Sequence, residues 1–200
     1  MIFTQTLPLT VTGFNLILKC NTLLFYLINN GLENSVFNVI MPILTNFGSL
    51  LVWCIICGLL YVFGGLKAKK VAILGLIALF ISNVAVYLLK PIIAEPRPFL
   101  VLGNVHQLIP ETEIYSFPSG HTANSFAVAT LIGLKYSLKF RNKKFRLIYP
   151  LIAFAVVIGF SRIYIGVHYP LDVIFGALIG VTCALIALKL EGRIFKFSMI

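Results

Sequence analysis

Charged residues are scarce in this 200-residue chain, and acidic residues are the scarcest of them. Asp, Glu, Lys and Arg make up 11% of the sequence, and only six residues are acidic. A soluble domain normally carries roughly 25% charged residues, and a disordered chain combines high charge with low hydrophobicity. Both classes are therefore excluded. No long polar segment remains that could form a separate soluble domain.

The chain is instead rich in apolar residues. They make up 60% of the sequence, and the mean hydropathy is +1.00. A chain of this length cannot bury so many apolar side chains in one core, and lipid is the solvent that accepts apolar surface. The sequence predicts a single all-α membrane domain over residues 1–200 that crosses the bilayer several times.

Six apolar, charge-poor runs are long enough to cross about 30 Å of hydrocarbon at about 1.5 Å per residue. They cover roughly residues 9–29, 44–64, 71–90, 119–138, 147–163 and 171–189. The first run is interrupted by Lys19 and Asn21, which also fits a tilted or interfacial helix. A short interfacial helix over residues 35–42 is a further possibility. The stretch 91–117 is polar and rich in proline, so no helix is expected to run through it.

The basic residues predict the orientation in the membrane. The excess of 16 Lys and Arg over six acidic residues would suggest nucleic acid in a soluble protein, but no basic helix with interleaved aromatics is present. Twelve basic residues fall within residues 65–70, 135–146 and 189–196. The positive-inside rule places these segments, and with them both termini, in the cytoplasm. The protein is therefore expected in the plasma membrane.

Cysteine offers no sign of redox chemistry. All four cysteines lie in apolar runs, where a thiol behaves as a small hydrophobic group. Cys54 and Cys57 have Cys-x-x-Cys spacing, but no βαβ pattern surrounds them. We expect no redox role, no cofactor and no obligate protein partner.

Three blocks of polar residues lie at the outer ends of different predicted spans, at residues 90–98, 118–121 and 161–172. Lys and Arg are charge-assisted donors, and the Arg fork matches phosphate oxygens. The backbone amides at a helix N-terminus add further donors for an anion. The blocks therefore predict a phosphate site. Its proposed ligands are Lys90, Arg97, Ser119, Gly120 and Arg162.

Two histidines in these blocks have the chemistry that phosphate hydrolysis needs, which is a nucleophile and a general acid. Asp172 follows His168 by four residues, across a predicted helix start with Pro170 at its first position. Asp172 can therefore accept a hydrogen bond from one imidazole nitrogen and leave the other free to attack phosphorus. His121 is the second histidine. Three cations already face the phosphate while the blocks hold few carboxylates, so no metal is expected.

The motifs Lys-x6-Arg-Pro, Pro-Ser-Gly-His and Ser-Arg-x5-His-x3-Asp, in this order, resemble the signature of the type 2 phosphatidic acid phosphatase (PAP2) superfamily. The resemblance implies a bundle of six transmembrane helices, similar to PAP2 enzymes and haloperoxidases, and a lipid phosphate substrate in the bilayer. It implies that His168 becomes a phosphohistidine, that Asp172 orients it and that His121 is the general acid. The first forty residues carry no part of the signature.

Several alternatives remain open. Undecaprenyl diphosphate is the leading substrate, and phosphatidylglycerophosphate, phosphatidic acid and lipid A 1-phosphate are alternatives. A channel or transporter would also place charges at membrane depth, and haloperoxidases share the pocket of the family. Tyr115, Tyr164 and Tyr169 are interpreted as an aromatic belt. His106 lies outside every block and is interpreted as a loop residue.

Overall fold

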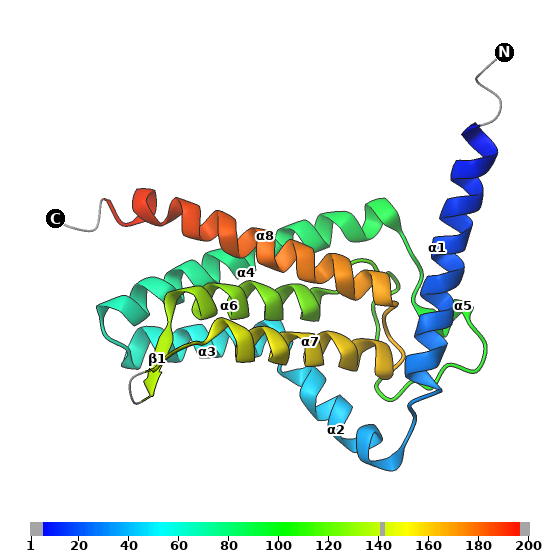
Figure 1. The fold of residues 1–200 in the computed structure, drawn as a ribbon, viewed down its shortest axis with the longest axis horizontal. Coiled ribbons are helices and arrows are strands. Elements are labelled where there is room, and N and C mark those ends of the chain that lie inside the picture. The colour runs from blue at the N-terminus through cyan, green and yellow to red at the C-terminus, as the bar shows by residue number, and fades with distance from the viewer. Residues whose placement is uncertain (1–5, 141–142, 197–200) are drawn as a thin grey trace.

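The structure is a computed structural model that describes residues 6–140 and 143–196 (Figure 1). Nearly all of its regular structure is helical, as expected. In chain order the elements are α1 Thr6–Asn29, α2 Ser35–Asn46, α3 Leu50–Phe63, α4 Leu66–Ile93, α5 Pro98–Val101, α6 Gly120–Lys135, β1 Ser137–Phe140, β2 Lys143–Arg146, α7 Ile148–Tyr164 and α8 Pro170–Ile194.

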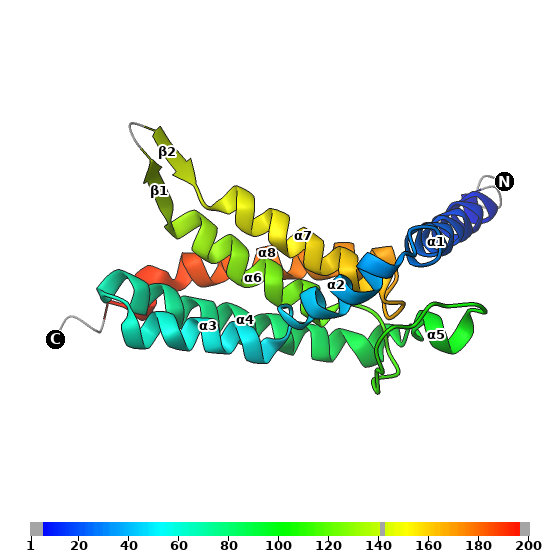
Figure 2. The same cartoon turned by 90° about the horizontal axis from the view of Figure 1, so that it is seen from below.

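The helices α3, α4, α6, α7 and α8 run along the long axis of the molecule and form one bundle, with α6 packed against α4, α7 and α8 (Figures 1 and 2). Small residues allow the close approach of α6 and α8. A Cβ on Gly180 would lie 2.3 Å from the Ala123 carbonyl oxygen, and one on Gly176 would lie 2.6 Å from that of Ser119. Such contacts are typical of membrane helices, where small residues let backbones pack directly.

The predicted spans are only partly matched. The helices α4 and α8 are each long and apolar enough to cross a bilayer, and α2 and α3 give a third candidate if taken as one bent span. These two helices meet at an angle of 56°, and the Ser49 side chain caps α3 by accepting from the Val52 N–H. The predicted run 44–64 is therefore broken. Six transmembrane spans remain unconfirmed.

The helix α1 differs most from the predicted arrangement. It lies transverse to the bundle at the end where α7 finishes and α8 begins (Figures 1 and 2). Asn29 fixes its C-terminal end by donating to the carbonyls of Tyr164 at 2.7 Å and His106 at 2.8 Å. The Leu171 N–H donates to Asn21 at 3.0 Å. This position agrees with the interfacial alternative, and the cytoplasmic location of both termini stays a prediction.

Two connections contain structure that was not expected. The helix α4 continues through Pro91 to Ile93 and ends at Ala94, whose φ of 51° is left-handed. No helix runs through 91–117, as expected, although α4 extends three residues into this stretch and the short helix α5 lies within it. The loop after α6 forms an antiparallel hairpin that pairs Ser137 with Arg146.

The bundle has two chemically different ends. The hairpin, the start of α4 and the end of α8 lie at one end, and these elements carry the basic segments assigned to the cytoplasm (Figure 2). The loop 94–119 and the connection from α7 to α8 lie at the other end (Figure 1). The three polar blocks therefore meet at the end opposite the basic segments.

Candidate active site

The three blocks, which are far apart in the sequence, line one cavity of about 340 Å³. Six of the eight predicted site residues form its wall, namely Lys90, Arg97, Gly120, His121, Arg162 and His168. The other two, Ser119 and Asp172, are fully buried. The structure thus brings the predicted residues together, with six facing the cavity and two supporting its wall.

His168 and Asp172 form the buried pair that their spacing predicts. The Nδ1 atom of His168 lies 3.1 Å from Oδ2 of Asp172. The same oxygen accepts the Tyr169 N–H at 2.8 Å, and Pro170 is the first residue of α8. The exposed fractions of the two side chains are 2% and 0%. The first turn of α8 therefore holds the carboxylate against the imidazole.

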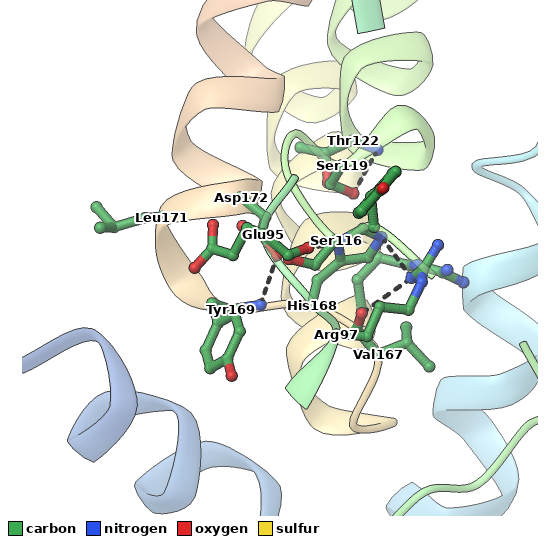
Figure 3. A network of polar contacts seen from close by, with 12 residues as sticks. Glu95, Arg97, Ser116, Ser119, Thr122, Val167, His168, Tyr169, Leu171 and Asp172 are labelled. Carbon is green, nitrogen blue, oxygen red and sulfur yellow. Dashed lines mark hydrogen bonds and ion pairs between the residues drawn. The ribbon is translucent and has the colours of Figure 1, made fainter. Parts of the chain in front are cut away.

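The other imidazole nitrogen, Nε2, lies 3.2 Å from Nη1 of Arg97 (Figure 3). Arginine has only donors, so Nε2 accepts and presents its lone pair, while Nδ1 carries the proton that it donates to Asp172. Burial, followed by the positive charges of Arg162, Arg97 and Lys90, lowers the pKa of His168 well below its ordinary value. His168 is therefore a neutral imidazole.

The N-terminus of α6 approaches this pair from the other side. The Ser119 N–H donates to the backbone carbonyl of Asp172 at 3.0 Å, and its Oγ accepts from the hydroxyl of Thr122 at 2.9 Å. Ser119 thus joins α6 to α8, and its amide is already paired. Gly120 lines the cavity, and a Cβ on it would meet only Val86, at 3.7 Å. The absent side chain keeps this part of the cavity open.

His121 follows one residue later and faces the cavity. Its ring packs against Gly48, because a Cβ on Gly48 would lie 3.0 Å from Cβ and 3.2 Å from Cδ2 of His121. The His121 carbonyl accepts from Ser125 at 2.8 Å, and the single tryptophan, Trp53, donates to the same hydroxyl at 3.3 Å. The backbone and one face of His121 are therefore fixed by α3 and the turn before it.

The two arginines are almost fully buried, each with 2% of its side chain exposed. Arg97 donates through Nε to the Glu113 carbonyl at 2.7 Å and through Nη1 to the Val167 carbonyl at 2.9 Å. Arg162 donates through Nη1 to the hydroxyl of Thr45 at 3.0 Å. These contacts hold both guanidinium groups at the cavity wall without neutralising their charge.

Glu111 and Glu113, which were not among the predicted site residues, also line the cavity. Glu113 pairs with Lys90 and with Arg97, whose Nη2 lies 3.0 Å from Oε2. Burial alone would raise the pKa of Glu113, but its hydrogen bond and charge interaction with Lys90 and the charge of Arg97 lower it. The sequence did carry a signal, because three of the six acidic residues in the chain, Glu95, Glu111 and Glu113, fall in the polar stretch 91–117.

Glu95 is a third acidic residue that was not predicted to belong to the site. It lies beside Asp172 on the segment that follows α4 (Figure 3). Burial raises the pKa of Glu95, while Oδ1 of Asp172 is buried without a hydrogen-bond partner among the described residues. A protonated Glu95 can donate to a carboxylate, which would satisfy that oxygen.

Other sequence interpretations have mixed outcomes. His106 lies outside the cavity wall, as interpreted, with Nδ1 3.4 Å from Glu33. The aromatic belt is wrong for Tyr164 and Tyr169, which are buried in the core. Tyr164 donates to Asn38 at 2.6 Å, because its helix end packs against α2.

Within residues 6–140 and 143–196, no group of three or more His, Cys, Asp or Glu side chains is placed to hold a metal ion.

Comparisons with known proteins agree with this geometry. Residues 71–196 match the sequence profile of the PAP2 superfamily. An undecaprenyl-diphosphatase, BcrC, of Bacillus subtilis is 34% identical over 166 residues, which cover 83% of this chain and 77% of the relative. An undecaprenyl-diphosphatase of Sulfolobus acidocaldarius is 32% identical over 173 residues, which cover 86% of this chain and 78% of that relative.

Two solved structures have a similar fold. The crystal structure of Aquifex aeolicus LpxE superimposes with a TM-score of 0.72 at 36% identity, covering 85% of this chain and 95% of that one. The crystal structure of a PAP2-type phosphatidylglycerolphosphate phosphatase from Bacillus subtilis gives a TM-score of 0.71 at 22% identity, and the match covers 90% of this chain and 88% of that one. The chain belongs to the PAP2 superfamily. It is a multi-pass integral membrane lipid phosphatase with the PAP2-like all-α fold.

Proposed function

We propose that this protein is an undecaprenyl-diphosphate phosphatase that removes the terminal phosphate through a phosphohistidine at His168. The observation that carries the proposal is the orientation of His168, whose Nδ1 pairs with Asp172 and whose Nε2 lies at the wall of a cavity lined by Lys90, Arg97 and Arg162. The two undecaprenyl-diphosphatases that match most of the chain support this choice of substrate.

In the first step, Nε2 of His168 attacks the terminal phosphorus and an N–P bond forms. The bond from phosphorus to the bridging oxygen breaks, and undecaprenyl phosphate leaves with a proton from His121. Lys90, Arg97 and Arg162 stabilise the charge that builds up on the equatorial oxygens, as cationic clamps do in phosphoryl transfer. Asp172 stabilises the positive charge that develops on the imidazole.

In the second step, water attacks the phosphohistidine while His121 accepts its proton. The N–P bond breaks, orthophosphate is released and His168 returns to its neutral form. Ser119 and Gly120 act in different ways. Gly120 leaves room for the phosphate at the N-terminus of α6, where the helix dipole favours an anion. Ser119 keeps α6 in register with the catalytic turn of α8.

A phosphatidylglycerophosphate phosphatase is the second candidate. Phosphatidylglycerophosphatase B of Bacillus subtilis is 34% identical, but over only 86 residues, or 42% of this chain. The lipid phosphate would hold its tail in the bilayer while its head group enters the cavity at the interface. Phosphatidic acid and lipid A 1-phosphate would bind in the same way and belong in the same comparison.

The decisive experiment is a comparison of purified protein on these four lipids in one detergent, with His168→Ala as the inactive control. We expect undecaprenyl diphosphate to give the highest kcat/KM. A higher value for phosphatidylglycerophosphate would replace the proposed substrate with the second candidate. Hydrolysis that persists in His168→Ala would reject the proposed nucleophile.

We also propose that the cavity opens to the outside of the plasma membrane, because the basic segments gather at the opposite end of the bundle. Single cysteines at Gln107 and Lys69, in a cysteine-free background, test this on intact cells with an impermeant maleimide. Both positions are exposed. We expect Gln107→Cys to react and Lys69→Cys to react only after the membrane is opened. The reverse pattern would place the cavity in the cytoplasm.

A further inference from the structure

Two glutamate carboxylates form ion pairs with the cationic side chains that would bind the proposed phosphate. Oε2 of Glu111 lies 3.1 Å from Nη2 of Arg162 and 3.6 Å from Nη2 of Arg97. Oε2 of Glu113 lies 3.0 Å from Nη2 of Arg97 and pairs with Lys90. Both glutamates line the same cavity as the cations. All three cations are therefore bound by carboxylate oxygens before any phosphate arrives.

The partners of the two arginines divide into two kinds. Nη1 of Arg97 and Nη1 of Arg162 donate to neutral oxygens, those of Val167 and Thr45, which hold the guanidinium groups to the protein. Nη2 of both arginines instead faces a glutamate that lines the cavity. A carboxylate and a phosphate accept from arginine with the same planar geometry. The glutamates thus occupy donors that a phosphate would use.

The Glu113 side chain can leave the cations while its backbone stays in place, since the Glu113 carbonyl accepts from Nε of Arg97 at 2.7 Å. Residues 110–113 form neither helix nor strand. Backbone hydrogen bonds hold the chain on either side of these residues. The Leu108 N–H donates to the Ile165 carbonyl at 3.2 Å, and the Arg97 N–H donates to the Ile114 carbonyl at 3.2 Å. The side chain of Glu113 is 59% exposed. The Glu113 carboxylate can therefore move into water with little loss of burial.

We infer that Glu111 and Glu113 compete with phosphate for Lys90, Arg97 and Arg162, and thereby keep the affinity for orthophosphate low. This inference rests on the proposed function, in which orthophosphate is the last product to leave. A cavity with three free cations would hold that product tightly. Every anion that enters must first displace the carboxylates, and the free energy that this requires lowers its binding affinity. The nucleophile itself is unchanged.

The test is direct binding of orthophosphate to the purified, detergent-solubilised protein by titration calorimetry, which needs no lipid and no turnover. Glu111→Gln and Glu113→Gln keep the size of the side chain and remove its charge. We expect each to bind orthophosphate about tenfold more tightly than the natural protein, which corresponds to about 1.4 kcal/mol. Competitive inhibition of hydrolysis by orthophosphate should strengthen by the same factor.

Glu33→Gln is the matched control. Glu33 is a partly exposed carboxylate at the same end of the molecule, paired with His106 and outside the cavity wall, and its replacement should leave the affinity unchanged. Unchanged or weaker binding in Glu111→Gln and Glu113→Gln would overturn the inference. The lipid comparison on the natural protein reports separately on the proposed function. Tighter phosphate binding without undecaprenyl-diphosphate hydrolysis would keep the inference and reject that substrate.

Discussion

Nδ1 of His168 lies 3.1 Å from Oδ2 of Asp172, and both side chains are buried at the first turn of α8. The same oxygen accepts the Tyr169 N–H, so the carboxylate is held by two donors. The hydrogen bond to Nδ1 directs the lone pair of the imidazole to Nε2. The pair therefore sets both the tautomer and the direction of the proposed nucleophile.

Asp172→Asn tests this relationship. The amide oxygen can still accept the Tyr169 N–H, so we expect the protein to fold. The charge that stabilises the imidazolium is lost, and kcat should fall about 10²- to 10⁴-fold, as when comparable orienting carboxylates are removed. Glu191→Gln is the control, because Glu191 lies at the far end of α8 and pairs with Lys135. Activity of Asp172→Asn equal to that of the natural protein would contradict the assigned role.

The pH dependence follows from the lowered pKa of His168. The nucleophile must be neutral, and a lowered pKa keeps it neutral as the pH falls below about 6.5, the ordinary value for histidine. The acidic limb of kcat/KM for an activated aryl phosphate should therefore lie below pH 6.5. An acidic limb with a midpoint at or above 6.5 would argue against a buried neutral nucleophile.

The same pKa shift affects folding. In the unfolded chain the imidazole of His168 becomes protonated as the pH falls below about 6.5, whereas in the folded chain it stays neutral. Protonation of His168 therefore favours the unfolded chain, and the free energy of unfolding should decrease as the pH falls below about 6.5.

Gly48 supports His121 sterically and offers a prediction about the general acid. A Cβ at Gly48 would lie 2.6 Å from Cγ2 of Ile158 and 3.0 Å from Cβ of His121, so Gly48→Ala must displace the histidine. We expect kcat to fall about tenfold, a cost of about 1.4 kcal/mol in the barrier, for lipid substrates with poor leaving groups. Activated aryl phosphates should be affected less. In Gly58→Ala the new Cβ meets nothing within 4 Å, so its kcat should match that of the natural protein.

Much of the site could be predicted from the sequence, because charged and imidazole side chains at membrane depth are costly and their spacing is therefore informative. His121, His168 and the three cations meet as their motifs indicate. The partners of these cations could not be predicted, since the contact of Glu111 with Arg162 joins residues 51 positions apart. Composition likewise could not show that α1 lies across the end of the bundle. A transverse helix and a spanning helix can share the same hydropathy.

Metal dependence is a separate prediction. Lys90, Arg97 and Arg162 supply the positive charge that a metal would otherwise bring to the phosphate. We expect hydrolysis to continue unchanged in EDTA, measured as orthophosphate release from the purified protein. Loss of activity in EDTA that magnesium restores would count against the proposed mechanism.

The central claim is that phosphate is transferred to Nε2 of His168, and the most direct test is to trap it there. His121→Ala lacks the proposed base for the second step, so it should accumulate phosphoenzyme when mixed with an activated aryl phosphate. After an alkaline quench, peptide mass spectrometry should find an acid-labile phosphate on His168, and the double variant with His168→Ala should carry none. Phosphate on Ser119 or on another residue, or label that persists in the double variant, would contradict the account.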